Sequence, residues 1–295
     1  MLNTNKLGMI TAPLLGIMLL GGCMKGETET VKKEANPLVS VQEYTGQGYK
    51  LPNGDKNDKI AEANRDKILP AMEKFFLDKY KTNVEVHNIV GNKHGATVFV
   101  ESKGEPHFNT FAIIPIDNKE NVRPDGIWTE EGQVEFSIKS GLYAMIYEEQ
   151  LKTLDMYLEK LTKEQPVIGV QAEAIQNTKS TGYTTPYYFI TVPSDSFDPL
   201  YKTYLEKPET TKAEYQAAVK TITPDPELYN IIINLYMKDK NQKPDQTLFD
   251  QIVADLEKMN LPPGLHTVSL HENSIDIDSP NESKDNSLER EIQKY

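Results

Sequence analysis

Apolar residues recur at helical spacing in three long stretches of the chain, 56–81, 131–163 and 247–260. Spacings of three and four positions place these side chains on one face, so each stretch is predicted to be an amphipathic helix. Pro70 lies inside the first stretch and predicts a kink or two abutting helices there. Gly141 weakens the middle of the second stretch.

Shorter apolar runs rich in β-branched and aromatic residues predict strands. Three of them follow one another closely, at 84–90, 96–101 and 111–116. Because parallel pairing needs a long crossover, these short connections predict an antiparallel meander. Further strands are predicted at 187–192, 231–237 and 265–270.

Two short helices are predicted between the fourth and fifth of these strands, at 196–206 and 211–221. Thr211 and Glu214 have the spacing of a capping box, in which each side chain satisfies a backbone N–H of the first helical turn. The second short helix is therefore predicted to begin just after Thr211.

The order of these elements predicts an α+β fold, an antiparallel meander packed by amphipathic helices. Pro166 ends the second long helix, and an irregular stretch follows it. Two α+β lobes, 41–165 and 166–273, are one interpretation, and a single domain with a long connection is the other. The polar segment 274–295 is predicted to be a disordered tail.

The start of the chain has the features of a lipoprotein signal peptide, predicted to span 1–22. A secretory signal has a positive start, an apolar run of about 7 to 15 residues and a small-residue cleavage site, and Lys6 and the run 7–20 match in order. Leu-Gly-Gly before Cys23 resembles the lipobox of bacterial lipoproteins, in which Cys23 would receive a diacylglyceryl group. The alternative is an ordinary signal peptide with an unrelated cysteine.

The segment 23–40 is polar and charged without periodicity, and is predicted to be a lipidated, flexible tether. Two acyl chains suffice for stable attachment, so no membrane-spanning helix is required. The expected location is the outer face of the cell membrane. Since Cys23 is the single cysteine, no internal disulfide is available to stabilise the body.

The chain has 44 acidic against 32 basic residues, a formal charge of −12. This balance argues against nucleic acid and anionic membrane surfaces, because binding to both depends on positive charge. Partners are expected to be neutral or cationic, unless the charge serves solubility alone.

No sequence motif for a nucleophilic hydrolase, zinc protease, nucleotide-binding loop or dinucleotide fold is present, and no cofactor and no metal are predicted. Histidine is the residue most often used for metal binding and proton transfer near neutral pH. His87, His94 and His107 lie on or between the strands of the predicted meander, where some of them could converge. Glu105 and His107 flank a proline and form a candidate acid–base pair. The alternative is that these histidines are surface or hydrogen-bonded residues.

Aromatic residues supply a second candidate site. Tyr183, Tyr187 and Tyr188 surround a turn, and Trp128 is the sole tryptophan. Exposed rings with polar handles suit binding to glycans or peptides. We hypothesise a binding surface that uses these four residues and His107. In the alternative interpretation the tyrosines enter the core through strand pairing, and their complete burial would exclude such a surface.

Seven stretches between residues 41 and 270 form a distinctive series: VQEYTGQGYKLPNG, VHNIVG, VFVESKGEPHFNTFAIIPID, GLYAMIYEE, EAIQNTKSTGYTTPYYFI, INLYMKDK and LPPGLHTVSL. In this order they resemble an uncharacterised lipoprotein family of Gram-positive bacteria, a family built on a domain of unknown function. The resemblance implies a lipid anchor at Cys23 and no particular activity or ligand.

Two classes of function remain. The first is a noncatalytic lipoprotein that binds an envelope protein, a peptide or a wall polymer, and it is favoured by the anchor and the absence of a catalytic motif. The second is a cell-envelope hydrolase whose acidic and histidine residues meet only in the folded chain. A deep pocket with paired acids would favour the hydrolase, and an aromatic or apolar surface would favour binding. A solute-binding receptor is a third, less well supported class.

Overall fold

Two β-sheets carry most of the strands in a computed structural model that describes residues 38–178, 180–277 and 287–295. The predicted signal peptide, Cys23 and most of the predicted tether lie outside these residues. Residues 36–295 form one compact unit. Within the described part of the chain, no helix combines the length and apolarity needed to cross a membrane.

The smaller sheet is the predicted antiparallel meander, which the structure confirms. It consists of β2 (Val84–Asn92), β3 (Gly95–Ser102) and β4 (Asn109–Pro115) in sequential order. Its register is regular except for a β-bulge at His87, between the pairs Val86↔Val100 and Asn88↔Phe99. Such a bulge redirects a side chain at a sheet, and His87 belongs to the candidate site described below.

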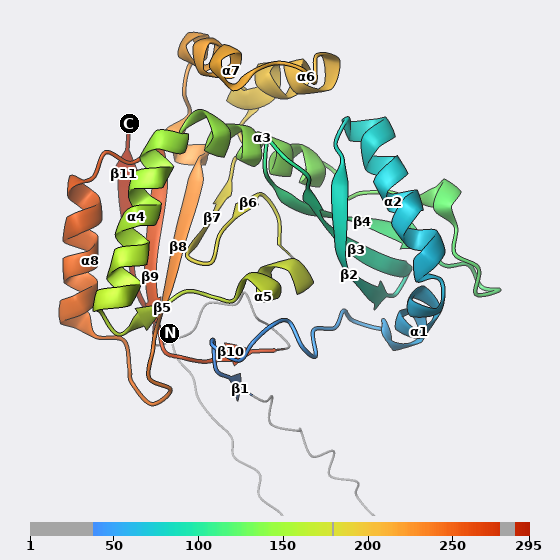
Figure 1. Cartoon of the computed structure of the whole chain (residues 1–295), viewed down its shortest axis with the longest axis horizontal. Coiled ribbons are helices and arrows are strands. Elements are labelled where there is room, and N and C mark those ends of the chain that lie inside the picture. Colours follow the sequence, from blue (N-terminus) through green and yellow to red (C-terminus); the bar gives the residue numbers. More distant parts are fainter. Residues whose placement is uncertain (1–37, 179, 278–286) are drawn as a thin grey trace, which may run out of the picture. The chain divides into compact units, whose positions relative to one another are not determined.

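Two abutting helices, α1 (Asp55–Ala63) and α2 (Arg65–Tyr80), pack against this sheet (Figure 1). Their junction is Asn64, whereas Pro70, expected to mark it, lies inside α2. The side-chain amide of Asn64 donates to the Ile60 carbonyl at 2.8 Å. The backbone carbonyl of Asn64 accepts a hydrogen bond from the Lys67 N–H at 2.9 Å. Asn64 thus ends one helix and begins the next.

The larger sheet has the strand order β11-β9-β8-β7-β6, with β5 also paired to β8. β8 and β9 are parallel and are joined by the crossover helix α8 (Gln246–Lys258), so this sheet is mixed rather than a simple meander. The strands are β5 (Val167–Ile168), β6 (Tyr183–Thr184), β7 (Tyr188–Thr191), β8 (Asn230–Met237), β9 (Gly264–His271) and β11 (Leu288–Lys294).

Strand β11 corrects the prediction of a disordered tail over 274–295. It pairs along its whole length with β9, and Ile292 is buried beside His266. The C-terminal segment is polar because it is an edge strand with one side toward solvent. Its order comes from backbone hydrogen bonds to a distant strand, which composition does not reveal.

The predicted helix 131–163 is two helices, α3 (Gln133–Ile146) and α4 (Glu148–Glu164), that meet at Tyr147. α3 is buried on nearly all sides and contacts β4, β6 and β7. α4 is amphipathic and lies beside α8 along the larger sheet (Figure 1). Gly141, expected to weaken the helix, lies within α3 without interrupting it.

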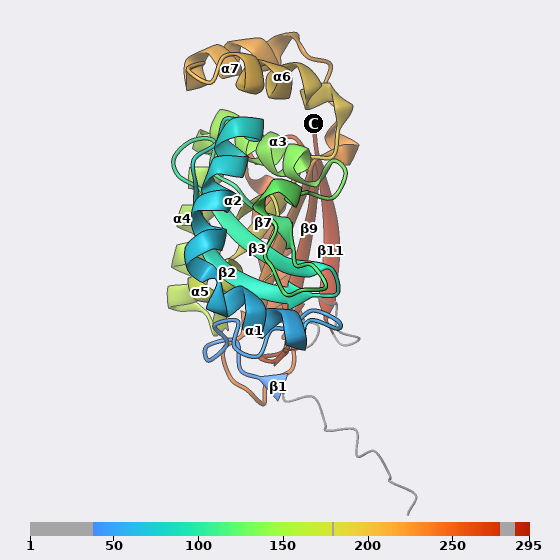
Figure 2. The ribbon, with the colours of Figure 1, turned by 90° about the vertical axis from the view of Figure 1, so that its right-hand side faces the viewer.

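Helices α6 (Asp198–Glu206) and α7 (Lys212–Ala218) lie above α3 in both views (Figures 1 and 2). The predicted capping box at the start of α7 is present, with Thr211 and Glu214 bonded to each other's backbone N–H groups. Helix α5 (Ala172–Asn177) packs against β2 and β3.

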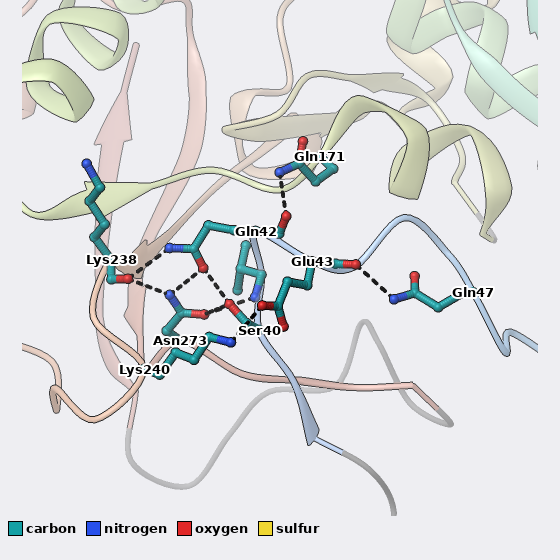
Figure 3. A network of polar contacts seen from close by, with 9 residues as sticks. Ser40, Gln42, Glu43, Gln47, Gln171, Lys238, Lys240 and Asn273 are labelled. Carbon is teal, nitrogen blue, oxygen red and sulfur yellow. Dashed lines mark hydrogen bonds and ion pairs between the residues drawn. The ribbon is translucent and has the colours of Figure 1, made fainter.

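The first described residues form β1 (Leu38–Val39), which pairs with β10 (Ile275–Asp276). The predictions placed β1 at the end of the tether 23–40 and β10 at the start of the tail 274–295, and the pairing corrects both predictions for the residues of these two strands. A polar network holds the following residues to the loop after β9 (Figure 3). In it, Asn273 accepts from the Val41 N–H at 2.9 Å and donates to the Lys238 carbonyl at 2.9 Å.

One apolar core extends across Pro166. It contains Ile68 and Leu142 from one side of that residue and Ile233 and Leu270 from the other, each with no exposed side-chain surface. A division into two lobes at this point would cut through the core, so the single-domain interpretation describes this part of the chain.

Candidate functional site

A pocket of about 330 Å³ lies where α6 and α7 cover the end of α3. It is lined by three tyrosines, Tyr183, Tyr204 and Tyr215, together with Met145 and two prolines. Charged side chains at the pocket come from Glu105, Glu148 and Lys212. Remaining lining residues are Ala144 and Thr210.

Gly141 positions the loop between β3 and β4, which contributes Glu105 and Pro106 to the lining of the pocket. A Cβ atom on this residue would lie 2.7 Å from the His107 carbonyl oxygen, so the α3 backbone approaches the loop more closely than any other residue permits. The Ser102 hydroxyl, at the end of β3, closes the same loop. It donates to the Pro106 carbonyl at 3.0 Å and accepts from the Phe108 N–H at 2.9 Å. Pro106 is thereby fixed at the pocket wall.

The pocket tyrosines are held by contacts behind the cavity. The Tyr204 hydroxyl is 2.7 Å from the buried Thr82 hydroxyl, and this contact fixes the position of the Tyr204 side chain beside the pocket. Burial raises the pKa of Tyr183 and of Tyr204, and raises the pKa of Tyr215 to about 12. All three phenols therefore stay protonated and uncharged at physiological pH.

Two of the three charged residues at the pocket form an ion pair with each other, and the third does not. The Lys212 ammonium forms an ion pair with Glu148, which also contacts Lys152 at 3.1 Å. Glu105 is exposed and forms no ion pair with any described residue. The pocket thus carries one uncompensated negative charge.

Behind the pocket, Tyr188 links the larger sheet to α4. It is 1% exposed, and its hydroxyl donates to Asp155 Oδ1 at 2.9 Å. Burial raises the pKa of the Asp155 carboxyl, and the Tyr188 hydrogen bond opposes this rise. Tyr183 stands between Tyr188 and the pocket, with ring centroids 6.2 Å apart.

On the other side of Tyr183, two histidines converge on one carboxylate. His87 Nε2 lies 2.6 Å from Glu101 Oε2, and His107 Nε2 lies 3.4 Å from Oε1. The bulge in β2 places His87 here, and the His107 ring meets the Tyr183 ring edge to face at 5.8 Å. Among the described residues, no group of three histidine, cysteine or acidic side chains has a geometry that could hold a metal ion.

The structure brings together only part of the predicted aromatic surface. Tyr183 lines the pocket, whereas Tyr188 is buried, as the core interpretation expected. Tyr187 is partly buried against Gly169. Trp128 is 40% exposed beside β4, where its backbone pairs with Ile113, and it does not line the pocket. A continuous platform of all these rings is therefore not formed.

The predicted acid–base pair of Glu105 and His107 is not formed, because the carboxylate that contacts His107 is that of Glu101, at 3.4 Å. Glu105 is exposed at the pocket. His94 is exposed in the turn between β2 and β3. His266 and His271 are both buried in β9.

Sequence reasoning missed Tyr204, Tyr215, Glu148 and Lys212 as pocket residues. Each lies on a helix whose existence was predicted, but no local pattern separates a ring that faces a cavity from one that fills the core. The capping box at Thr211 was the available signal, because it places the start of α7, and hence Lys212, at a defined point.

The chain belongs to the family described as "Protein of unknown function (DUF1672)", whose model matches residues 31–295. A solved structure similar to this chain is the crystal structure of a DUF1672 family protein from Staphylococcus aureus subsp. aureus Mu50. It is 21% identical, with a TM-score of 0.71, and the match covers 88% of this chain and 98% of that one. No curated protein matches this sequence. The resemblance to an uncharacterised family is confirmed.

Proposed function

We propose that this protein is a noncatalytic, membrane-anchored lipoprotein that binds an envelope partner in the pocket between α3, α6 and α7. The pocket is the single observation that carries the proposal. Ligand sites are concave, mostly apolar and about 300–1,000 Å³ in volume, with a few polar groups. This cavity of about 330 Å³, lined by three tyrosines and three charged residues, lies within that range of volume and offers several polar groups, and its lining is more polar than apolar.

Within the unit formed by residues 36–295, the helices that cover the pocket lie far from the first described strand. β1, the first described element, lies at one end in both views, and α6 and α7 lie at the other (Figures 1 and 2). The proposed lipid attachment, Cys23, precedes β1 by a short segment.

The binding proposal is tested by placing a photo-crosslinking amino acid at Thr210, which lines the pocket, in the full chain on intact cells. We expect a discrete crosslinked product. The matched control carries the same probe at Lys243, an exposed residue in the loop before α8. Equal crosslinking from both positions would show nonspecific proximity and would count against the pocket as the binding site.

The anchor is tested separately with the Cys23→Ala variant in cells fed an alkyne fatty acid. We expect loss of the lipid label and release of the protein from the membrane fraction. Label that persists in the variant would show that Cys23 is not the lipidated residue.

A second candidate is a cell-envelope hydrolase, and the observation in its favour is the Glu101 carboxylate between two imidazoles. A carboxylate that orients an imidazole is the usual arrangement of a general base. Both Nε2 atoms face Glu101 here, so Nδ1 of His107 would be the proton acceptor. Turnover of wall peptides or esters that His107→Gln abolishes, with folding intact, would favour this candidate over pure binding.

A further inference from the structure

The charge and the walls of the pocket point to a more specific ligand, and we infer that the pocket binds a primary ammonium group on an unbranched aliphatic stem, presented by a peptide. This inference rests on the proposed binding function and deepens it. Four features of the molecule support it: the uncompensated carboxylate, the tyrosines that line the cavity, the size of the cavity and the charge of the whole chain.

The first observation is the charge of the pocket. The Lys212 ammonium is already paired with Glu148, so these two charges largely cancel. Glu105 has no ion-pair partner among the described residues and lines the same cavity. A ligand with a positive group would satisfy this carboxylate, whereas a carboxylate or phosphate ligand would be repelled by it.

The second observation is the composition of the walls. The faces of aromatic rings attract cations, with about 0.5–1 kcal/mol per contact at exposed sites and about 2 kcal/mol or more in dry ones. Tyr183, Tyr204 and Tyr215 all line this one cavity, so three aromatic side chains are close to any group that enters it. Met145 and the two prolines add apolar surface that suits the methylenes between a backbone and a terminal amine.

The third observation is size. A volume of about 330 Å³ lies at the lower end of the range for ligand pockets. It accommodates one long side chain rather than a segment of a polymer. The occupant is therefore a single group that enters the cavity while the rest of its molecule stays outside.

The net charge of the chain decides between carriers of such an amine. At −12, the protein repels polyanionic wall polymers, including those that bear amino groups on an anionic backbone. A peptide with a lysine-like side chain has no such backbone charge. The inferred partner is thus an amine-bearing peptide.

The inference is tested by calorimetry or ligand-observed NMR with the purified full chain in detergent. The probes are acetyl-Gly-Lys-Gly-amide and acetyl-Gly-norleucine-Gly-amide, which differ in the terminal ammonium and are otherwise similar in shape. We expect the lysine peptide to bind roughly ten-fold more tightly, because ion pairing and cation–π contacts are available only to it.

Two variants locate the interaction. Glu105→Gln removes the unpaired carboxylate at an exposed position and is expected to weaken the lysine peptide up to about five-fold while leaving the norleucine peptide unchanged. Glu257→Gln changes the net charge equally at an exposed site on α8 and is expected to have no effect. A circular dichroism spectrum shared by all forms shows that folding is retained.

The outcomes separate the two proposals. Equal affinity for both peptides, or equal effects of the two variants, would overturn the ammonium inference. If neither peptide binds but the Thr210 probe still captures a partner on cells, the ammonium inference fails and the binding function stands. If neither experiment detects binding, both proposals fail.

Discussion

Asn273 accepts a hydrogen bond from the hydroxyl of Ser40 at 3.0 Å, although 233 positions separate the two residues in the chain. The Asn273 side chain is 3% exposed and also contacts the Val41 N–H, the Gln42 side chain and the Lys238 carbonyl (Figure 3). One buried amide therefore holds the first described residues to the body at the end from which the proposed anchor extends.

Replacement of Asn273 by Ala is expected to lower the free energy of unfolding by about 2 kcal/mol, because the buried Val41 N–H loses its acceptor. Hydrogen exchange at the Val41 amide should accelerate by more than the lower free energy of global unfolding accounts for. Gln47→Ala, an exposed member of the same network, is the control and should have little effect. Similar exchange rates at Val41 in both variants would contradict this role for Asn273.

Replacement of Gly141 by Ala is expected to destabilise the protein, although alanine is the better helix former by about 1 kcal/mol. The new Cβ would meet the His107 carbonyl oxygen at 2.7 Å, and overpacking of this kind costs about 1–3 kcal/mol. Urea denaturation measures the change. Gly126→Ala, at an exposed site near the flexible ring of Pro115, is the control. A stabilised Gly141→Ala variant would show that this close approach is not a constraint.

The hydroxyl of Tyr188 is expected to stabilise the fold by about 1.5–3 kcal/mol, the range for a hydrogen bond to a charged group. Tyr188→Phe leaves Asp155 half-buried without this donor. The neighbouring Tyr187→Phe change is the control, because its hydroxyl is 3.5 Å from Thr162 and contributes little. Equal losses of stability from the two variants in thermal unfolding would refute the assignment.

His266 is expected to make stability depend on pH. Burial, reinforced by the nearby Lys294 charge and opposed by a hydrogen bond to the Pro262 carbonyl, lowers its pKa from 6.5 to about 4. Between these values the unfolded chain binds a proton that the folded chain does not. Stability is therefore complete above about pH 6.5 and falls as the pH is lowered toward 4, by about 3 kcal/mol from this residue.

Urea denaturation between pH 7 and pH 4 checks this prediction. His266→Gln should flatten the dependence by that amount, whereas His94→Gln, at an exposed position, should leave it unchanged. If the wild type and His266→Gln lose stability in parallel, the buried imidazole is not responsible for the loss.

Local pattern predicted most of the helices and strands correctly, because burial on one face leaves a period of two or 3.6 residues in the sequence. Helix α8 and strands β2, β3 and β4 are examples. The junctions were less predictable. The breaks at Asn64 and Tyr147 depend on how neighbouring helices turn to reach the same core, and neither residue is a strong helix breaker.

Pairing between distant segments left no such pattern. β11 looked disordered because its side chains are mostly polar, yet its backbone completes the edge of the larger sheet. Similarly, the parallel arrangement of β8 and β9 follows from the crossover through α8. Hydrogen bonds of the main chain are the same for every residue type, so composition does not record them.

The sequence by itself determined most of the helices, the strands of the meander and β7, β8 and β9, the α+β class, the family resemblance and the proposal that Cys23 carries a lipid. Only the tertiary structure decided that Tyr183, Tyr204 and Tyr215 share one cavity, that Glu105 lines it unpaired, and that His87 and His107 meet at Glu101. The physical reason is that hydrophobic periodicity specifies which face of an element is buried, whereas the element that covers this face is chosen by packing across the whole chain.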